Sequence, residues 1–153
     1  CFIVIIEFFV VARPLNLWLT ANGFALYIAA YRLRCWGMAT LGRQWAIHAV
    51  GAKKIRKVRL IRLGPYKYLR HPVYLGIMCE CVSLAAMSNC YFALTFALCI
   101  CLPLILVRSF VEETYSIRRF GSSYLQYKKQ VPMFLPLRPQ SAISFLALFF
   151  TAR

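Results

Sequence analysis

The stretch CYFALTFALCICLPLILV, residues 90 to 107, contains no charged side chain. A helix needs about 20 apolar residues to cross the roughly 30 Å hydrocarbon layer of a bilayer, so this stretch is predicted to span a membrane. The composition of the 153-residue chain agrees, because 61% is hydrophobic, only 15% is charged and the mean hydropathy is +0.64. Water-soluble domains carry about a quarter charged residues, so the bilayer is the expected solvent.

The segment just upstream pairs with this span. Pro72 to Met87 is apolar except for Glu80, and it is joined to the span by the short uncharged link Ser88-Asn89. Lengths and link together predict a helical hairpin with an uncharged tip. Seven cysteines are scattered over the apolar stretches, and the pair Cys79/Cys81 is spaced by two, which points two helical side chains nearly opposite ways. We therefore interpret the cysteines as small apolar fillers and assign no metal site.

Two further apolar segments precede the hairpin. Pro14 to Leu33 has the length of a span, and Phe2 to Ala12 is interpreted as the rest of a cut-off span, because the chain starts without Met. The apolar tail Ile143 to Phe150 is too short to cross and is expected to lie in the interface or pack on the bundle. We predict an all-α fold, a polytopic transmembrane helical bundle with about four spans plus short interfacial helices, as a single membrane-embedded domain over residues 1–153.

The charges form blocks between the apolar segments. Nineteen Lys and Arg face four Glu and no Asp, which gives a formal net charge of +15. In a soluble protein this excess would point to nucleic acid, but cytosolic loops of membrane proteins also collect Lys and Arg. The blocks at 32 to 70 and 108 to 138 flank the hairpin on both sides, so both are predicted to face the cytosol. We expect a multi-pass membrane protein without a nucleic-acid partner.

The first informative motif is GPYKYLRHPVYLG, residues 64 to 76, where the basic loop enters the third span. Gly64-Pro65 predicts a turn, His71 is pushed out of the α region by the next proline, and Pro72 suits the first helical position. A helix start carries a partial positive charge and Arg70 adds a full one, so a carboxylate would be held well here. A purely structural alternative, in which Arg70 snorkels and His71 caps the helix, stays open.

The second motif is EETYSIRRFGSSYLQYKKQVPMFLP, residues 112 to 136. The helix of the fourth span is predicted to continue to about Phe120, to end at Gly121, and to restart after Ser122-Ser123 as a short helix that ends before Pro132. Tyr124 and Tyr127 would share a face of the short helix. Topology brings both motifs to one cytosolic face. Alternatively, the Glu pair at the start of the motif is only a solvated partner for the arginines that follow it.

Both motifs resemble the signature of the isoprenylcysteine carboxyl methyltransferase family, which is similar to the phospholipid N-methyltransferases of membranes. The matching residues are Leu41, Gly42, Trp45, Gly64, Pro65, Tyr66, Arg70, His71, Pro72, Tyr74, Leu75, Gly76, Glu112, Glu113, Phe120, Gly121, Tyr124, Tyr127, Pro132 and Pro136. The resemblance covers roughly residues 40 to 136. Ser116 departs from it, where the family usually has Leu, and Ser123 stands where it often has an acid.

The resemblance implies an integral membrane enzyme that binds S-adenosylmethionine at its cytosolic face. The acceptor would be lipophilic or membrane-delivered: an isoprenylcysteine carboxylate, a lipid amine or a thiol. The implied cofactor-binding residues are Tyr66, Arg70, His71, Pro72, Tyr74, Leu75, Glu112 and Glu113, with Arg70 and His71 also in the catalytic role. The two Glu would accept hydrogen bonds from ribose hydroxyls or the α-amino group, and Arg70, His71 and the helix start would hold the carboxylate or the adenine side.

Two other functions compete. Membrane sterol and steroid reductases, which use NADPH, have a similar C-terminal half, but their cofactor carries several phosphates and two Glu inside the motif suit it poorly. A non-catalytic scaffold or a small transporter would use Glu7 and Glu80 as intramembrane carriers, since acids within spans are costly and often functional. Glu80 could line a substrate tunnel or sit protonated in the core, and we favour the second.

Overall fold

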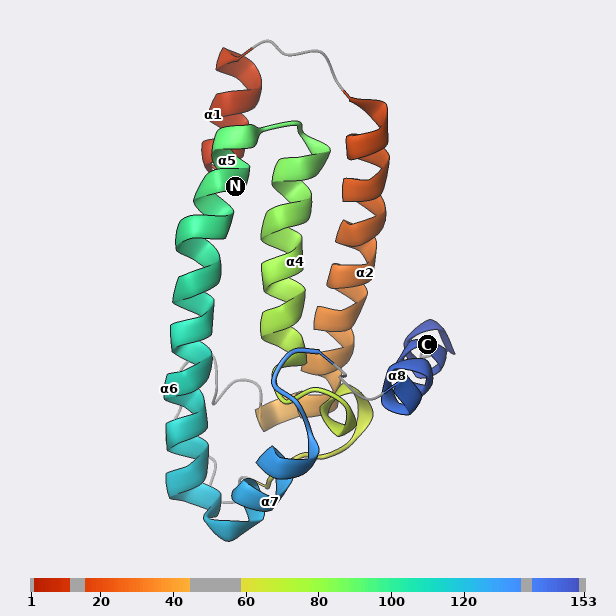
Figure 1. The fold of residues 1–153 in the computed structure, drawn as a ribbon, viewed down its shortest axis with the longest axis vertical. Coiled ribbons are helices and arrows are strands. Elements are labelled where there is room, and N and C mark those ends of the chain that lie inside the picture. The colour runs from red at the N-terminus through yellow and green to blue at the C-terminus, as the bar shows by residue number, and fades with distance from the viewer. Residues whose placement is uncertain (1, 12–15, 45–58, 136–138, 152–153) are drawn as a thin grey trace. The chain divides into compact units, whose positions relative to one another are not determined.

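The computed structural model describes residues 2–11, 16–44, 59–135 and 139–151, and every regular element within these ranges is helical (Figure 1). The predicted all-α class is therefore confirmed for the described residues. The elements are the α-helices α1 (Phe2–Val10), α2 (Leu17–Leu41), α4 (Pro72–Met87), α5 (Tyr91–Phe96), α6 (Leu102–Phe120), α7 (Ser122–Gln130) and α8 (Pro139–Thr151), the 3₁₀ turns η1 (Gly42–Gln44) and η2 (Gly64–Lys67), and the π-helical turn η3 (Ala97–Cys101).

The chain folds into two compact units. Unit 1 comprises Cys1–Arg32 and Tyr74–Val111, and unit 2 comprises Leu33–Val73 and Glu112–Arg153. The helices α2, α4 and α6 each contribute residues to both units. The single membrane-embedded domain expected over the whole chain stays a prediction.

Residues 91 to 107 of the predicted span lie within one continuous helical segment, Tyr91–Phe120. Among the described residues this 30-residue segment is the one helix that is long and apolar enough to cross a membrane by length and composition. Most of its apolar side chains are exposed, unlike those of a helix in the core of a soluble domain. The four-span bundle itself stays a prediction, because α4 is shorter than a typical span.

A π-helical turn interrupts this segment at Ala97–Cys101, directly before Pro103. A proline inside a helix has no N–H to donate, and its ring collides with the carbonyl four residues earlier, here that of Cys99. Widening the preceding turn to π geometry accommodates the ring without ending the helix. The apolar segment thus stays continuous despite its proline.

The predicted hairpin is confirmed, with α4 at the expected bounds and a turn at Ser88-Asn89. Asn89 adopts the left-handed conformation, φ 56°, and its side chain ties the turn to α2. Its Oδ1 accepts from the Asn16 backbone N–H at 3.1 Å, and its Nδ2 donates to Thr20 Oγ1 at 2.9 Å. Thr20 Oγ1 in turn donates to the Met87 carbonyl at 3.1 Å. We refer to Asn16, Thr20 and Asn89 as the tip clip.

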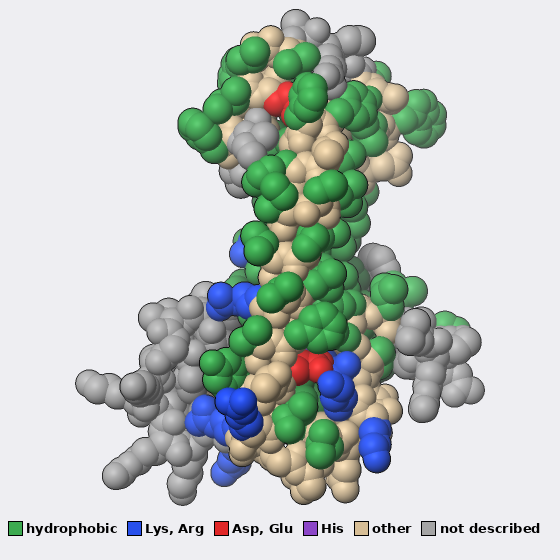
Figure 2. Space-filling view, turned by 60° about the vertical axis from the view of Figure 1, so that its left-hand side comes forward, with side chains coloured by type: hydrophobic (Ala, Val, Ile, Leu, Met, Phe, Trp, Pro, Cys, Tyr) green, Lys and Arg blue, Asp and Glu red, His purple; other side chains and the backbone are tan. Residues whose placement is uncertain are grey.

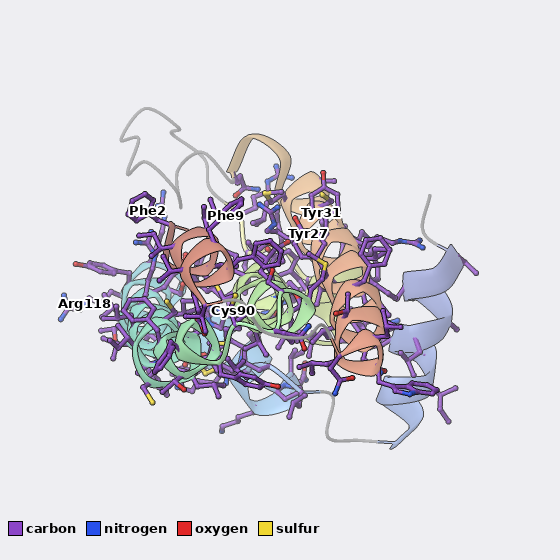
Figure 3. All side chains as sticks on the ribbon, turned by 90° about the horizontal axis from the view of Figure 1, so that it is seen from above. Phe2, Phe9, Tyr27, Tyr31, Cys90 and Arg118 are labelled. Atoms are coloured by element: carbon purple, nitrogen blue, oxygen red, sulfur yellow. The ribbon has the colours of Figure 1, made fainter. Side chains whose placement is uncertain are left out.

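Within unit 1, α4 lies between α2 and the helix formed by α5 and α6 (Figure 1). The contact with α2 is very close at Gly23, where an added Cβ would stand 2.7 Å from the Met87 backbone nitrogen. On α1, Phe2 and Phe9 project away from the helix and are exposed, whereas Tyr27 and Tyr31 stack on α2 with ring centroids 6.4 Å apart (Figure 3).

Glu7 has a structural role in unit 1. Its buried carboxylate accepts hydrogen bonds from the backbone N–H groups of Phe92 at 3.0 Å and Ala93 at 2.8 Å. These N–H groups belong to the first turn of α5, where a helix leaves its donors without intrahelical partners. A carboxylate engaged as a helix cap favours a structural role for Glu7 over the intramembrane carrier that the transporter hypothesis requires.

The second helix is longer than predicted, which is a correction to the expected basic loop at 32 to 70. α2 continues to Leu41 instead of ending at Leu33, so Arg32 and Arg34 lie on a helix. Charged side chains do not end a helix, whereas a residue with positive φ does, and Gly42 has φ 53°. The lysines and arginines at 45 to 58, with Trp45, lie outside the described residues.

The C-terminal helix α8 is also longer than the eight apolar residues that suggested it. It has 13 residues, about 20 Å, which is still too short to cross the hydrocarbon layer. In unit 2 its Phe145 and Phe149 lie against Trp36, with ring centroids 6.1 and 6.4 Å away, and Phe145 also meets the edge of Tyr68. Packing on the chain's own helices, one of the two predicted placements, is therefore observed for this face of α8.

Candidate functional site

The RHP segment, residues 70–72, is held in unit 2 by its backbone. The η2 turn precedes it, Leu69 is completely buried, and Pro72 begins α4 as the sequence predicts. The backbone N–H of Arg70 donates to the Pro132 carbonyl at 3.0 Å, and that of His71 donates to the Met133 carbonyl at 3.2 Å. The end of the second motif thus lies alongside the centre of the first.

The second motif has its predicted break at Gly121, but the short helix begins at Ser122 and not after Ser122-Ser123. α6 ends at Phe120, Gly121 has φ 55°, and α7 follows directly. Tyr124 and Tyr127 are buried on one face of α7, with ring centroids 5.9 Å apart. Glycine adopts a positive φ far more readily than other residues, which explains why the helix breaks at Gly121.

The Tyr127 hydroxyl fixes α7 to the first motif, because it donates a buried hydrogen bond of 2.6 Å to the Tyr66 carbonyl. Burial raises the pKa of Tyr127, so its hydroxyl keeps the proton that it donates. Burial and the negative charge of Glu113 outweigh the nearby Arg70 guanidinium and raise the pKa of Tyr124 to about 12. Both tyrosines are therefore neutral at physiological pH.

The charged side chains of the two motifs meet in one cluster, which we call the charge cluster: Arg70, His71, Glu112, Glu113 and Lys128. Glu113 Oε1 pairs with Arg70 Nη1, and Glu113 Oε2 pairs with Lys128 Nζ at 2.8 Å. The imidazole of His71 lies between the carboxylates, with Nε2 3.5 Å from Glu113 Oε1 and Nδ1 3.8 Å from Glu112 Oε2. On the face shown in Figure 2, an acidic patch lies next to Lys or Arg side chains.

The two glutamates have unequal surroundings. The side chains of Glu113, His71 and Arg70 are only 4%, 8% and 9% exposed, whereas that of Glu112 is 22% exposed. Both oxygens of Glu113 are engaged by cations of this chain. The prediction gave the two residues the same role, but a ligand reaching the cluster would meet the more accessible Glu112 first.

Of the predicted site residues, the structure brings Arg70, His71, Glu112 and Glu113 together in unit 2. Tyr66 reaches this region through its carbonyl, and Pro72 is buried at the start of α4. Tyr74 and Leu75 belong to unit 1, where the Tyr74 hydroxyl accepts from Arg108 Nε at 3.0 Å. Their part in cofactor binding stays a prediction.

Sequence reasoning missed Lys128. The signal was present, because Lys128 follows Tyr124 by four residues and therefore shares its helix face. Once Tyr124 is placed on the buried face, Lys128 is directed toward the same neighbours. The basic residue was instead counted among the charges of a cytosolic block.

The fold and the cluster define an all-helical protein with a long apolar helix and a buried Arg-His-Glu-Glu arrangement. The family model described as "Isoprenylcysteine carboxyl methyltransferase (ICMT) family" matches residues 23–118. The chain therefore belongs to the isoprenylcysteine carboxyl methyltransferase family, in agreement with the resemblance of its motifs. No solved structure matches the chain.

Several curated proteins are similar over most of the chain. The "Protein-S-isoprenylcysteine O-methyltransferase" of Schizosaccharomyces pombe is 34% identical over 121 residues, covering 78% of this chain and 50% of that protein. The mouse protein of the same name is 32% identical over 120 residues, with coverage of 78% and 42%. The "Nickel-cobalt-cadmium resistance protein NccN" of Alcaligenes xylosoxydans xylosoxydans is 32% identical over 108 residues, which cover 65% of this chain and 45% of that protein. The chain spans about half the length of these relatives.

Proposed function

We propose that this protein is a membrane methyltransferase that uses S-adenosylmethionine to methylate the carboxylate of an isoprenylated cysteine. The observation that carries the proposal is the charge cluster, in which a buried guanidinium, a buried imidazole and an accessible carboxylate converge in a family member. The names of the relatives supply the acceptor class. A lipid amine or a small thiol is the alternative acceptor.

The residues of the cluster fit the polar groups of the cofactor. S-adenosylmethionine carries a carboxylate, an ammonium group and two ribose hydroxyls. Arg70 Nε is a buried donor that has no hydrogen-bond partner among the described residues, and it is suited to a carboxylate. Glu112 is suited to the ammonium group or the hydroxyls, because a carboxylate accepts several hydrogen bonds and is accessible here.

When bound, the cofactor supplies a methyl group on a positively charged sulfur. The residues of this chain then have to bind, align and exclude water, because an in-line displacement needs orientation more than proton transfer. Arg70 and His71 would orient the bound molecule from the start of α4, and Pro72 and the Tyr66 backbone would form a rigid wall beside them. An acceptor carboxylate is already anionic, so no residue has to act as a general base.

The decisive experiment is transfer of a labelled methyl group in membranes that carry the protein. We expect an N-acetylated farnesylcysteine to be labelled, with the label lost as methanol on base treatment, as a carboxyl methyl ester requires. The same compound with its carboxylate blocked as an ester is the matched control and should take no label. Labelling of the blocked compound, or of a lipid amine alone, would contradict the proposed acceptor, and NADPH oxidation with a sterol would replace the function with reduction.

We also propose that the protein is integral and multi-pass, with both basic blocks in the cytosol. Support comes from the exposed apolar helix Tyr91–Phe120 and from the Lys and Arg excess of the sequence. A cysteine introduced at Ser88, in a background without the native cysteines, should react with an impermeant maleimide in intact cells. A cysteine at Lys129 should react only after permeabilisation. The reverse pattern would overturn the orientation.

A further inference from the structure

Lys128 has an unusual partner for a lysine on a short surface helix. Its side chain is 42% exposed, while the Glu113 carboxylate that it contacts at 2.8 Å is 4% exposed. Ion pairs between two exposed residues contribute little, because solvent screens them and both side chains lose entropy. A buried carboxylate is different, since its desolvation is offset only when its oxygens are paired. Lys128 therefore completes the neutralisation of a buried charge.

The pairing of Glu113 determines where the Arg70 guanidinium lies. Oε1 of Glu113 holds Arg70, and Oε2 holds Lys128. Without Lys128, Oε2 would lose its cation, and the carboxylate could turn to take a second hydrogen bond from Arg70. This movement would use a donor that the proposed cofactor carboxylate requires.

The position of α7 makes this arrangement rigid. Tyr127, the residue before Lys128, is tied to the Tyr66 carbonyl, and the Arg62 guanidinium lies over its ring at 5.5 Å from the centroid. Arg62 also donates to the Ser123 carbonyl in the first turn of α7. Lys128 is thus presented to Glu113 by a helix anchored at both its start and its centre.

From these contacts we infer that Lys128 is a positioning residue of the cofactor site, acting through Glu113 on Arg70. This inference rests on the proposed function. It gives the short helix α7 a role in cofactor affinity without any contact between Lys128 and the cofactor. The adjacent Lys129 is exposed and has the same charge, which makes it a matched control.

The test measures S-adenosylmethionine binding by titration calorimetry on the full chain in nanodiscs, for the wild type, Lys128→Met, Lys128→Arg and Lys129→Met. We expect Lys128→Met to raise the Kd about tenfold, which corresponds to about 1.4 kcal/mol. Lys128→Arg should restore the wild-type value within about threefold, and Lys129→Met should change it less than twofold. The KM of the acceptor should stay constant in all variants, because Lys128 acts on the cofactor side only.

A double-mutant cycle distinguishes positioning from general stabilisation. In the background Glu113→Gln, the further change Lys128→Met should have little effect on Kd, because the carboxylate through which Lys128 acts is gone. Additive losses, equal losses in the Lys128 and Lys129 variants, or an unchanged Kd in Lys128→Met would overturn the inference and leave the proposed function standing. A wild-type protein that does not bind S-adenosylmethionine would overturn the proposed function itself.

Discussion

Unit 1 and unit 2 are stabilised in different ways, although α2, α4 and α6 run through both. In unit 1 two helices approach until the backbone at Gly23 meets that of Met87, and polar side chains support this packing at the tip clip and at the Glu7 cap. In unit 2 the centre holds buried charges and aromatic pairs, including the Arg70–Glu113 ion pair. Apolar packing thus fixes the first unit, whereas the second depends on groups that also suit ligand binding.

This difference decides how each unit responds to substitution. A buried ion pair adds little net stability while intact, but loss of one partner leaves an uncompensated charge at a cost of about 3–5 kcal/mol. An added methyl group at a close helix contact costs less, about 1–3 kcal/mol, because the helices shift only as far as that group requires. Loss of a buried ion partner in unit 2 should therefore lower the stability more than a packing change in unit 1, and of the variants below only those in the charge cluster should change cofactor binding.

The largest effect is expected for Glu113→Gln in unit 2. The amide leaves both Arg70 and Lys128 without a carboxylate, so the stability should fall by about 3–5 kcal/mol and S-adenosylmethionine affinity by more than about a hundredfold. Denaturant-induced unfolding in detergent and calorimetry measure the two quantities. A stability within about 1 kcal/mol of the wild type would show that the ion network does not hold unit 2.

A smaller effect is expected for Gly23→Ala in unit 1, because the new Cβ would stand 2.7 Å from backbone nitrogen and 3.0 Å from Cα of Met87. Backbone cannot move aside as a side chain can, so we expect a loss of about 1–3 kcal/mol in the same unfolding assay. Cofactor affinity should not change.

The matched control for this variant is Gly37→Ala on the same helix, in unit 2. There the new Cβ would stand 2.7 Å from Cγ2 of Val73, a side-chain atom. The gain of about 1 kcal/mol from alanine in a helix applies at both glycines, but moving Val73 from its preferred χ1 rotamer costs less than moving backbone, so this variant should lose less stability than Gly23→Ala. Equal losses at both glycines would indicate that the two contacts are equally rigid.

A third effect, about 1–2 kcal/mol, is expected at the tip clip. Asn89→Ala removes the hydrogen bonds to Asn16 and Thr20 and places alanine at φ 56°. Asn89→Gly removes the same bonds but tolerates the positive φ, so it should lose less stability than the alanine variant. Unfolding curves of the two variants separate the side-chain contribution from the backbone contribution, and identical curves would exclude strain at this position.

Much of the fold was predictable from sequence because proline, glycine and apolar length act locally. Pro72 begins α4, Gly121 separates α6 from α7, and the uncharged run from residue 90 lies in the long helix, as expected. The end of α2 was misplaced because charge was taken as the boundary, whereas Gly42 sets it. The η3 turn was not foreseen, although Pro103 suggests a distortion once the helix is known to continue past it.

The candidate site was predictable in its members but not in its pairing. Motif residues from the two stretches do meet, and His71 lies near both glutamates. Nothing in the sequence distinguishes Glu112 from Glu113, because neighbouring residues on a helix differ only in the direction of their side chains. That direction depends on how α6 packs in unit 2, and so does the contribution of Lys128 from α7.

The smallest stability effect is expected for Glu112→Gln, the most informative partner of Glu113→Gln. Glu112 is partly exposed, and its Oε2 lies 3.8 Å from His71 Nδ1. Water can therefore solvate the imidazole when an amide replaces the carboxylate. Stability should therefore change by less than about 0.5 kcal/mol, whereas cofactor affinity should fall roughly tenfold to a hundredfold if the carboxylate accepts a charged hydrogen bond from the ligand. Glu113 would then be required for both folding and cofactor binding, and Glu112 for cofactor binding alone. A Glu112 variant that loses stability as Glu113→Gln does, or that binds the cofactor as the wild type does, would show that burial does not separate their roles.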